Sequence, residues 1–558
     1  MDRKLLIIPI IIGVLISGVF LLIILSDLLT EEPVEEIKIP SKITRGPFLS
    51  MVTQNSIYVS WWTDEPGNST VRYGTDLLMD VSVFNGTDVE KHEIKLDNLI
   101  FNSSYFYQVQ TANFSSEIYT FKTAPGFSVP VKFIFHGDNR GEFYTTEIPE
   151  KFKQILKNMN ASQPDLVFAV GDLIANDGIY EKDFKFLQKQ WDTYFKVINN
   201  YTHEIPWIYA IGNHDAPLNH NESSFTDVVV QPKTPDKLER YFSFDYGPVH
   251  FIILDTERNG GNTYEIVGEQ WNWLVEDLSS PRQAIHTLII MHKPLTSPYV
   301  PPYWTNQRGL FAREETGALF QELCENYSVT AIICSHDHMY HRDQIGSHNL
   351  TQIVTAGAGA PLYVSYENLG GFHHHTELEI NWKDIQVKLV KDNGTVMEDF
   401  MLETPYDLDF PNKPKISGIT FSSLDCNTGN TIDIEATIEG MSLDAKLYYS
   451  FDGLNWYNQT LTPLGQNYSG SIECTEATEI GQFYVDIKDD TNNRTVSDLY
   501  SFIVDGSTLP KEIETATSQY LIPQIPVDSG EKTTYTNYET KMYVDSLILI
   551  ELIIKRGY

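Results

Sequence analysis

Between residues 131 and 356, short apolar segments alternate with longer segments of helical pattern, and this alternation constrains the fold more than any other feature of the sequence. Apolar runs of this kind are typical of strands that are buried on both faces. The helical patterns lie near 147–159 and 181–199, and at 269–278 and 313–326. The sequence therefore predicts an α/β domain at about 128–405, in which helices cover a central sheet. The apolar runs are VKFIFH (131–136), DLVFAV (165–170), PWIYAI (206–211), YFSFDY (241–246), VHFIILD (249–255), HTLIIM (286–291), TAIICS (330–335) and TQIVTA (351–356).

Side chains that can bind a metal follow five of these runs. Because residues just past the carboxyl ends of strands in an α/β sheet meet in one crevice, we expect these side chains to converge. Carboxylate, amide and imidazole donors without a thiolate suit first-row divalent ions. The set is too large for one open metal site and fits two. Its members are Asp138, Asp172, Asn213, His214, His292, His336 and His338.

The order of these residues, with their neighbours, resembles the calcineurin-like metallophosphoesterases, and with the β-rich region before them it is similar to the purple acid phosphatases. The resemblance covers roughly residues 43–400. It implies a multidomain α/β plus β chain whose catalytic domain has four layers, α/β/β/α. The motifs that carry it are Gly137-Asp138, Gly171-Asp172, Gly212-Asn213-His214-Asp215, Met291-His292 and His336-Asp337-His338.

The resemblance also implies a role for each residue. His214 would be the general acid, and Asp215 would orient it. The cofactors would be two divalent or trivalent ions of Fe, Mn or Zn, and a hydroxide that bridges them would hydrolyse phosphomonoesters. Asp172 would bridge the two ions. One ion would be bound by Asp138, Asp172 and His338, and the other by Asp172, Asn213, His292 and His336.

Three positions depart from these families. Ala175 stands where purple acid phosphatases have the tyrosine that binds ferric iron, so the Tyr-ligated purple site is not expected. Arg140 stands where many relatives have a histidine ligand, which leaves the first metal with three protein donors. Arg140 is a candidate for contact with the substrate phosphate, since a guanidinium matches two phosphate oxygens, or for a surface ion pair. Ser335 replaces a glycine, and His341 is a further candidate for substrate binding.

Two other regions show the period-two alternation of β-strands. The region 43–125 predicts a fibronectin type III-like β-sandwich, in which the stretch 99–107, with Tyr105 and Tyr107, resembles the tyrosine corner, where a tyrosine hydroxyl bonds to the upstream backbone. The region 411–505 predicts an Ig-like β-sandwich, and its Cys426 and Cys474 are candidates for a disulfide in an oxidising exterior. Residues 506–558 predict a flexible tail with a short apolar end.

An uncharged apolar stretch at 5–25 is long enough to cross a bilayer, so residues 1–30 predict a membrane anchor and 31–42 a linker. Arg3 and Lys4 precede the stretch and acidic residues follow it, which favours a cytoplasmic N-terminus. A cleaved signal peptide is the alternative. Thirteen Asn-x-Ser/Thr triplets exceed the chance expectation and indicate N-glycans, with a polar, loop-rich surface as the alternative. We therefore expect a single-pass protein of the cell membrane with its catalytic domain outside the cytoplasm.

The net charge limits the partners. The chain has 40 Lys and Arg against 75 Asp and Glu, a formal charge of −35, so polymeric nucleic acid is not an expected partner. A phosphate-bearing substrate must then be held by something local and positive, such as metal ions. We expect a metal-dependent phosphoesterase that acts on small phosphomonoesters. A phosphodiesterase or nucleotidase of the same superfamily, and a catalytically degenerate surface adhesion or scaffold protein, are the alternatives.

Overall fold

The computed structural model describes residues 40–504, apart from 143–144, 176–183, 216–222, 233–239, 258–264, 281, 300–308, 311–313, 347–349, 407–412, 424, 427–428, 441–442, 454, 475–480 and 490–492. The predicted anchor at 1–30, most of the predicted linker and the predicted tail lie outside the described residues. Within the described part, no helix is both long enough and apolar enough to cross a bilayer.

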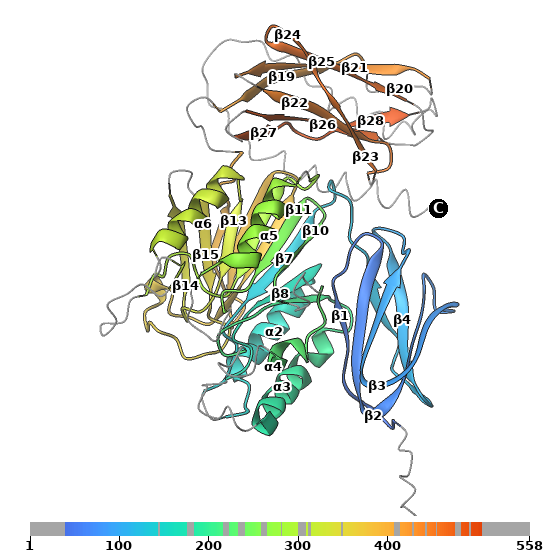
Figure 1. The fold of residues 1–558 in the computed structure, drawn as a ribbon, viewed down its shortest axis with the longest axis vertical. Helices are drawn as coiled ribbons and strands as arrows, with labels where there is room; N and C mark the ends of the chain where they lie inside the picture. The colour runs from blue at the N-terminus through green and yellow to red at the C-terminus, as the bar shows by residue number, and fades with distance from the viewer. Residues whose placement is uncertain are drawn as a thin grey trace, which may run out of the picture. The chain divides into compact units, whose positions relative to one another are not determined.

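The first described region is an antiparallel β domain (Figure 1). Its alternating sequence places every second side chain in the core, as Tyr105, Tyr107 and Val109 show. The backbone N–H of Ile100 donates a hydrogen bond to the Tyr105 hydroxyl at 2.8 Å, so Tyr105 is the tyrosine of this stretch that contacts the upstream backbone. The strands are β1 (Ile43–Ser50), β2 (Ser56–Gly74), β3 (Val81–Asp97), β4 (Ser104–Thr111), β5 (Phe114–Ser115) and β6 (Tyr119–Lys122).

The α/β region contains two six-stranded sheets. The first has the strand order β18-β17-β16-β7-β8-β9, in which β7, β8 and β9 are parallel and the other three strands are antiparallel to their neighbours. Its strands are β7 (Val131–His136), β8 (Leu166–Val170), β9 (Trp207–Ala210), β16 (His374–Asn381), β17 (Asp384–Lys391) and β18 (Val396–Met401).

The second sheet has the order β10-β11-β12-β13-β15-β14. Its four central strands are parallel, and an antiparallel strand closes each edge. Its strands are β10 (Phe242–Tyr246), β11 (Val249–Leu254), β12 (His286–Met291), β13 (Ala331–Cys334), β14 (Tyr340–Ile345) and β15 (Leu350–Thr355).

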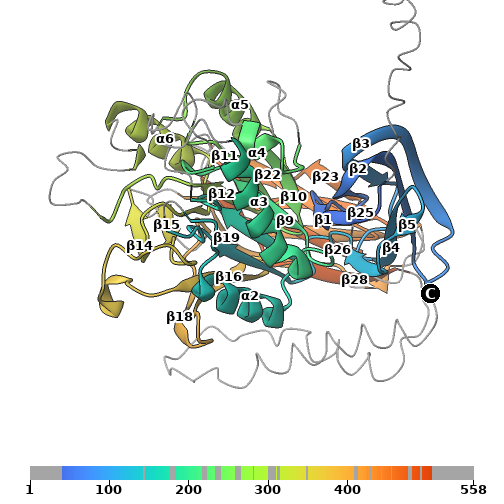
Figure 2. The same cartoon turned by 90° about the horizontal axis from the view of Figure 1, so that it is seen from below.

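The two sheets face each other, and helices cover their outer faces (Figures 1 and 2). Phe168 of β8 meets Phe251 of β11 between the sheets, with ring centroids 4.6 Å apart. On the outer faces, Trp191 packs with the first sheet and Phe320 with the second. The four layers implied by the family resemblance are therefore present, whereas the single central sheet predicted from the apolar pattern alone is wrong. The helices are α2 (Glu150–Ser162), α3 (Phe184–Ile198), α4 (Ser223–Thr226), α5 (Gly268–Ser279) and α6 (Glu314–Asn326).

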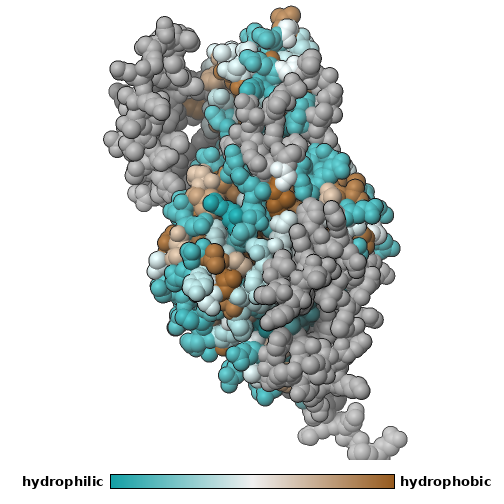
Figure 3. Space-filling model, turned by 90° about the vertical axis from the view of Figure 1, so that its left-hand side faces the viewer, coloured by the Kyte–Doolittle hydropathy of each residue, from teal (hydrophilic) through white to brown (hydrophobic). Residues whose placement is uncertain are grey.

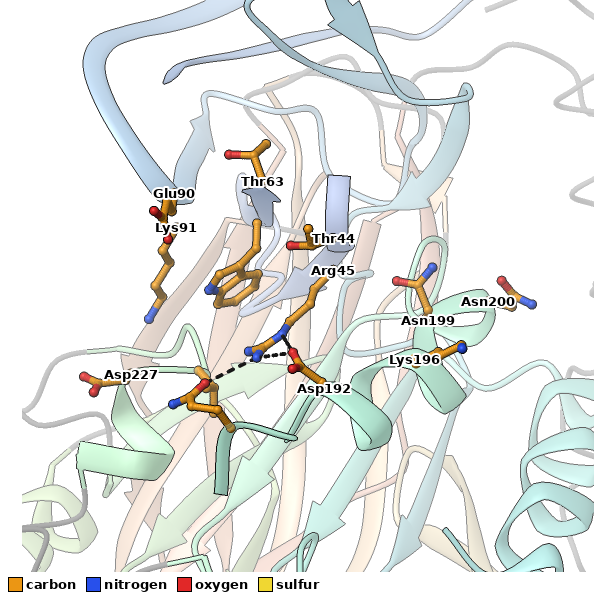
Figure 4. Close-up of a pocket in the computed structure, with 13 residues that line it drawn as sticks. Thr44, Arg45, Thr63, Glu90, Lys91, Asp192, Lys196, Asn199, Asn200 and Asp227 are labelled. Atoms are coloured by element: carbon orange, nitrogen blue, oxygen red, sulfur yellow. Dashed lines mark hydrogen bonds and ion pairs between the residues drawn. The ribbon is translucent and has the colours of Figure 1, made fainter. Parts of the chain in front are cut away.

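A polar hollow of about 940 Å³ lies between the first β domain and α3 (Figure 4). Arg45 of β1 reaches across it, and its Nε lies 2.9 Å from Oδ1 of Asp192. The Arg45 guanidinium also lies 5.8 Å from the Trp62 ring centre. The Arg45 side chain is 10% exposed and that of Asp192 is 61% exposed, so the cation–π contact on the buried side and the ion pair on the solvent side both join the β domain to the helix.

The described chain forms two units. One contains the residues up to Ile416 together with Glu439–Ala445 and Val485–Leu499, and the other contains most of the C-terminal β region. That β region has two sheets, and a disulfide joins Cys426 to Cys474. Its strands are β19 (Lys415–Phe421), β20 (Asp425–Cys426), β21 (Thr431–Glu439), β22 (Asp444–Ser450), β23 (Trp456–Thr460), β24 (Thr462–Leu464), β25 (Asn467–Glu473), β26 (Gly481–Lys488), β27 (Arg494–Val496) and β28 (Tyr500–Val504).

Candidate metal centre

The loops after β7 and β8 carry two aspartates in an unusual backbone conformation. Asp138 and Asp172 both have φ +55°, a left-handed conformation that is uncommon outside glycine. The Asp138 N–H donates to the carbonyl of Gly171 at 3.1 Å, and the Arg140 N–H donates to the carbonyl of Asp172 at 3.2 Å. These bonds lock the two loops together, which stabilises a conformation that would otherwise be strained.

Gly212, in the loop after β9, allows the closest approach in this region. A Cβ at Gly212 would overlap with the backbone nitrogen and Oδ1 of Asp172. Only glycine can therefore bring the third loop against the second. This approach places Asn213 and His214 beside Asp172.

The first donor group consists of Asp138, Asp172 and His338, whose candidate ligand atoms lie within 4.8 Å of one another. Nδ1 of His338 lies 2.7 Å from the carbonyl oxygen of Pro361, which can only accept, so Nδ1 carries the proton. The unprotonated Nε2 then faces Oδ1 of Asp138 at 3.0 Å. Among the described residues, that buried oxygen has no hydrogen-bond donor. Two acceptors that face each other in this way fit a bound cation.

The second donor group consists of Asp172, His292 and His336, with Asn213 beside them. Nδ1 of His292 lies 2.9 Å from the carbonyl of Val170, which fixes its proton there. Its Nε2 lies 3.2 Å from Oδ1 of Asn213, 3.3 Å from Oδ1 of Asp172 and 3.3 Å from Nδ1 of His336. Four candidate ligand atoms, each from a different loop, therefore lie close together.

Asp172 belongs to both groups, as the bridging ligand of a metal pair must. Burial alone would raise the pKa of its carboxyl, but positive charge on His292, His214 and Arg140 outweighs burial and lowers the pKa. The carboxylate is therefore ionised and available to two cations. The buried oxygen and imidazole donors of both groups fit a dinuclear metal centre.

The Asp215 side chain binds the backbone of the loops that follow β8 and β9. Its carboxylate accepts hydrogen bonds from the backbone N–H groups of Gly212, Asp172, Leu173 and Ile174, at 2.8–3.3 Å. Burial, and then the nearby charge of Asp172, raise the pKa of Asp215 to about 7. These bonds fix the turn that carries His214, and the role predicted for Asp215 in orienting His214 stays a prediction.

His214, the predicted general acid, lies at the edge of the donor groups. Its backbone N–H donates to Oδ1 of Asp172 at 2.9 Å, and its Nε2 lies 3.6 Å from Oδ2 of the same carboxylate. Its side chain is 14% exposed, whereas that of Asp172 is 1% exposed. His214 is therefore held beside the donors while its ring keeps access to the solvent side.

The positions that depart from the family pattern have distinct settings. Ala175 is buried, and its methyl side chain has no atom that can bind a metal. Arg140 is also buried, so its setting is not a surface ion pair. His341 lies in β14, where its Nε2 pairs with Oδ1 of Asp343 at 2.5 Å, and neither donor group includes it. The substrate contact predicted for His341 stays a prediction.

Ser335, which stands where relatives have glycine, contacts one of the predicted metal ligands. Its hydroxyl donates a short hydrogen bond to Oδ2 of Asp138, and the backbone N–H of His336 donates to the same oxygen at 2.7 Å. A Cβ at Gly137 would overlap with the Ser335 side chain. Gly137 therefore makes room for the serine, and the serine orients Asp138.

A buried ion pair behind His292 was not predicted. Nζ of Lys293 lies 2.6 Å from Oε2 of Glu257, and both side chains are 0% exposed. Glu257 follows the apolar strand β11, and Lys293 follows His292 directly. A charged residue just past an apolar strand is the signal that singled out the metal donors, and applied to β11 it would have found Glu257.

Comparison with known proteins supports this geometry. The family description "Calcineurin-like phosphoesterase" matches residues 131–340, and "Purple acid Phosphatase, N-terminal domain" matches residues 45–123. The Fe(3+)-Zn(2+) purple acid phosphatase 12 of Arabidopsis thaliana is 23% identical over 341 residues, which cover 56% of this chain and 68% of that protein. Purple acid phosphatase 23 of the same plant is 26% identical over 304 residues, which cover 50% of this chain and 62% of that protein. A phosphoenolpyruvate phosphatase of Allium cepa is 23% identical, with 58% of this chain and 68% of that protein covered.

A solved structure shows the same fold. The purple acid phosphatase isolated from yellow lupin (Lupinus luteus) seeds superposes with a TM-score of 0.50 at 18% identity, covering 64% of this chain and 73% of that one. The fold of the two chains agrees. The chain therefore contains a calcineurin-like phosphoesterase domain that follows a purple acid phosphatase N-terminal domain, and its relatives include purple acid phosphatases.

Proposed function

We propose that this chain hydrolyses small phosphomonoesters with two metal ions, and that His214 protonates the leaving group. The single observation that carries the proposal is that Asp172 belongs to two buried donor groups at once. Bound there, a pair of ions supplies positive charge for the phosphate and lowers the pKa of a water molecule. Fe, Mn and Zn all suit these donors.

The chain's own residues position the reaction. Asp138 and Asp172 are the carboxylates of the donor groups, so two divalent ions would leave the pocket positive inside a chain of net charge −35. A phosphate ester is drawn to such a pocket. His214 is partly exposed beside Asp172, where its imidazole can donate a proton to a leaving alkoxide.

The test of His214 uses two esters that differ in their leaving groups. The full chain, stripped and reloaded with Mn or Zn, is assayed with p-nitrophenyl phosphate and with an alkyl phosphate. A p-nitrophenolate leaves without help, whereas an alkoxide needs a proton, so His214→Ala should slow the alkyl ester by about 10²–10⁴-fold and the nitrophenyl ester far less. His214→Gln serves as the matched variant, and metal content must stay at the wild-type level in both.

Three results would contradict the proposal. Equal losses for the two esters would exclude His214 as the general acid. Faster turnover of a diester or a nucleotide would favour a phosphodiesterase or nucleotidase. No turnover by a chain that holds metal would favour the adhesion or scaffold function.

We also propose that residues 1–30 anchor the chain in the cell membrane, with the catalytic domain and its N-glycans outside. The disulfide between Cys426 and Cys474 supports an oxidising exterior. The full chain should sediment with membranes, whereas a chain that starts at residue 31 should not. Glycosidase should lower the apparent mass. A full chain in the soluble fraction would contradict the anchor, and an unchanged mass would contradict the glycans.

A further inference from the structure

Arg140 lies inside the first donor group. Its Nε is 3.6 Å from Oδ2 of Asp172, and its Nη2 is 3.5 Å from Nε2 of His338. Its side chain is only 6% exposed. A permanently charged guanidinium therefore lies against two of the three residues that would bind the first metal ion.

The contacts of Arg140 involve the lone pairs that a metal ion would need. Since Nδ1 of His338 donates to the carbonyl of Pro361, its Nε2 can only accept, and Nη2 of Arg140 is the donor that faces it. Oδ2 of Asp172 likewise faces Nε of Arg140. An ion at the first donor group must displace these N–H groups and also overcome the repulsion of a nearby positive charge.

The second donor group has a different setting. Nε2 of His292 faces the oxygens of Asn213 and Asp172, and an imidazole nitrogen of His336. The Arg140 contacts described above involve Asp172 alone among these residues, and they use Oδ2, whereas Oδ1 faces His292. An ion can enter the second donor group without displacing the guanidinium.

We propose that the two metal positions are unequal, because Arg140 acts as a resident cation of the first donor group. The second donor group holds its ion tightly. The first binds an ion only when Arg140 moves away from Asp172 and His338. This inference rests on the proposed function, since it concerns the same metal centre, and it adds an order of binding that the family resemblance does not contain.

Metal titration of the full chain tests the inference without an activity assay. The protein is stripped with a chelator and titrated with Mn²⁺ by calorimetry, and bound metal is counted after equilibrium dialysis. The wild type should bind two ions in two steps whose dissociation constants differ by at least about tenfold. This measurement needs no variant, so it stays decisive even if a substitution in the buried site fails to fold.

Variants of Arg140 then identify the cause. Arg140→Met removes the charge at similar length, and Arg140→His adds a ligand, so both should tighten the weaker step by at least about tenfold. Arg140→Lys keeps the charge and should keep the two steps apart. Arg342→Met is the matched control, because Arg342 lies in β14 with a side chain that is 40% exposed and belongs to neither donor group. It should leave both constants unchanged.

The outcomes separate this inference from the proposed function. Two ions bound with equal affinity by a wild type that hydrolyses phosphomonoesters would overturn the inference alone. A weaker step that is unchanged in both Arg140→Met and Arg140→His would do the same. A wild type that binds no ion would overturn both the inference and the proposed function.

Discussion

Asp172 is the residue on which the metal centre depends most. It contacts His214 and His292 through Oδ1, and it faces Arg140 through Oδ2. Its backbone conformation is fixed from outside, because its N–H donates to Asp215 at 2.8 Å. A left-handed aspartate that serves two donor groups must be held in place by its neighbours, and these contacts do so.

The donor residues could be predicted from sequence because each of them follows an apolar strand, and strand ends converge whatever the loops do. The setting of Arg140 could not be predicted, since a sequence does not show whether a guanidinium turns toward solvent or toward Asp172. Nor did the sequence show that Ser335 orients Asp138, because that contact joins residues 197 positions apart.

Asp215→Asn tests the role of the backbone contacts. An asparagine offers a single acceptor oxygen, so it cannot replace a carboxylate that accepts four backbone hydrogen bonds. We expect the metal-free protein to lose about 1.5–3 kcal/mol of unfolding free energy, measured by urea denaturation. Asp343→Asn, at a half-exposed ion pair in β14, is the control and should cost less than about 1 kcal/mol. An Asp215→Asn protein as stable as the wild type would show that these bonds do not stabilise the loops.

At the scale of elements, the α/β region has two facing sheets, whereas the apolar pattern of the sequence predicted one central sheet. A strand such as β8 is apolar and buried on both faces, which is consistent with helices on both sides or with a helix on one side and a sheet on the other. The apolar pattern therefore locates the strands but cannot choose between these arrangements. The choice came from the family resemblance and is confirmed by the packing of Phe168 against Phe251.

The strands that the sequence did not predict are β14, β16, β17 and β18. All four contain buried or partly exposed polar residues, such as His374 and His375 in β16 and Glu398 in β18. A prediction based on apolar runs and on period-two alternation assigns such residues to the surface or to loops. In β16 the histidines are buried because the strand lies between β17 and β7, a long-range pairing that local sequence does not show.

Phe168→Ala tests how strongly the two sheets depend on their common core. The Phe168 ring stacks on Phe135 with centroids 4.7 Å apart and packs against Phe251, and it is 1% exposed. Removal of the ring should cost about 3–5 kcal/mol of unfolding free energy. Phe168→Leu fills much of the same volume and should cost about half as much or less. Equal costs for the two variants would contradict close packing between the sheets.

At the scale of the whole molecule, the chain is strongly acidic, although its two donor groups fit cations. The chain carries a formal charge of −35, and hydrophobic residues on the face in Figure 3 occur in small groups among hydrophilic ones. Screening limits the long-range repulsion of a phosphate to about 10 Å at physiological salt. Binding of the proposed phosphate substrate would therefore depend on the local charge of the metal centre. The predicted domain limits at 43–125, 128–405 and 411–505 stay predictions.

Buried histidines should make the folded chain sensitive to acid. Burial lowers the pKa of His136 to about 3, of His374 to about 4 and of His92 to about 4. Each is neutral when folded but takes up a proton below pH 6.5 when unfolded, so stability falls as pH falls through this range. At pH 4.5, His136 alone should cost about 3 kcal/mol.

His136→Phe isolates one of these protons. The His136 ring lies between Phe152 and Trp207, with centroid distances of 5.2 and 5.4 Å, so a phenyl ring suits the site. We expect the loss of unfolding free energy between pH 7 and pH 4.5 to shrink by about 3 kcal/mol in the variant. A pH dependence equal to that of the wild type would show that His136 is not neutral in the folded chain.

Measurement of bound metal shows whether Asp172 is the shared ligand of two metal ions. The wild type, Asp172→Ala and His338→Ala are saturated with Mn²⁺, passed rapidly through a desalting column and analysed for metal per chain. Because Asp172 belongs to both donor groups and His338 only to the first, the wild type and His338→Ala should both retain the tightly held ion of the second group, and Asp172→Ala should retain almost none. An Asp172→Ala protein that retains as much metal as the wild type would contradict a centre built around a shared aspartate.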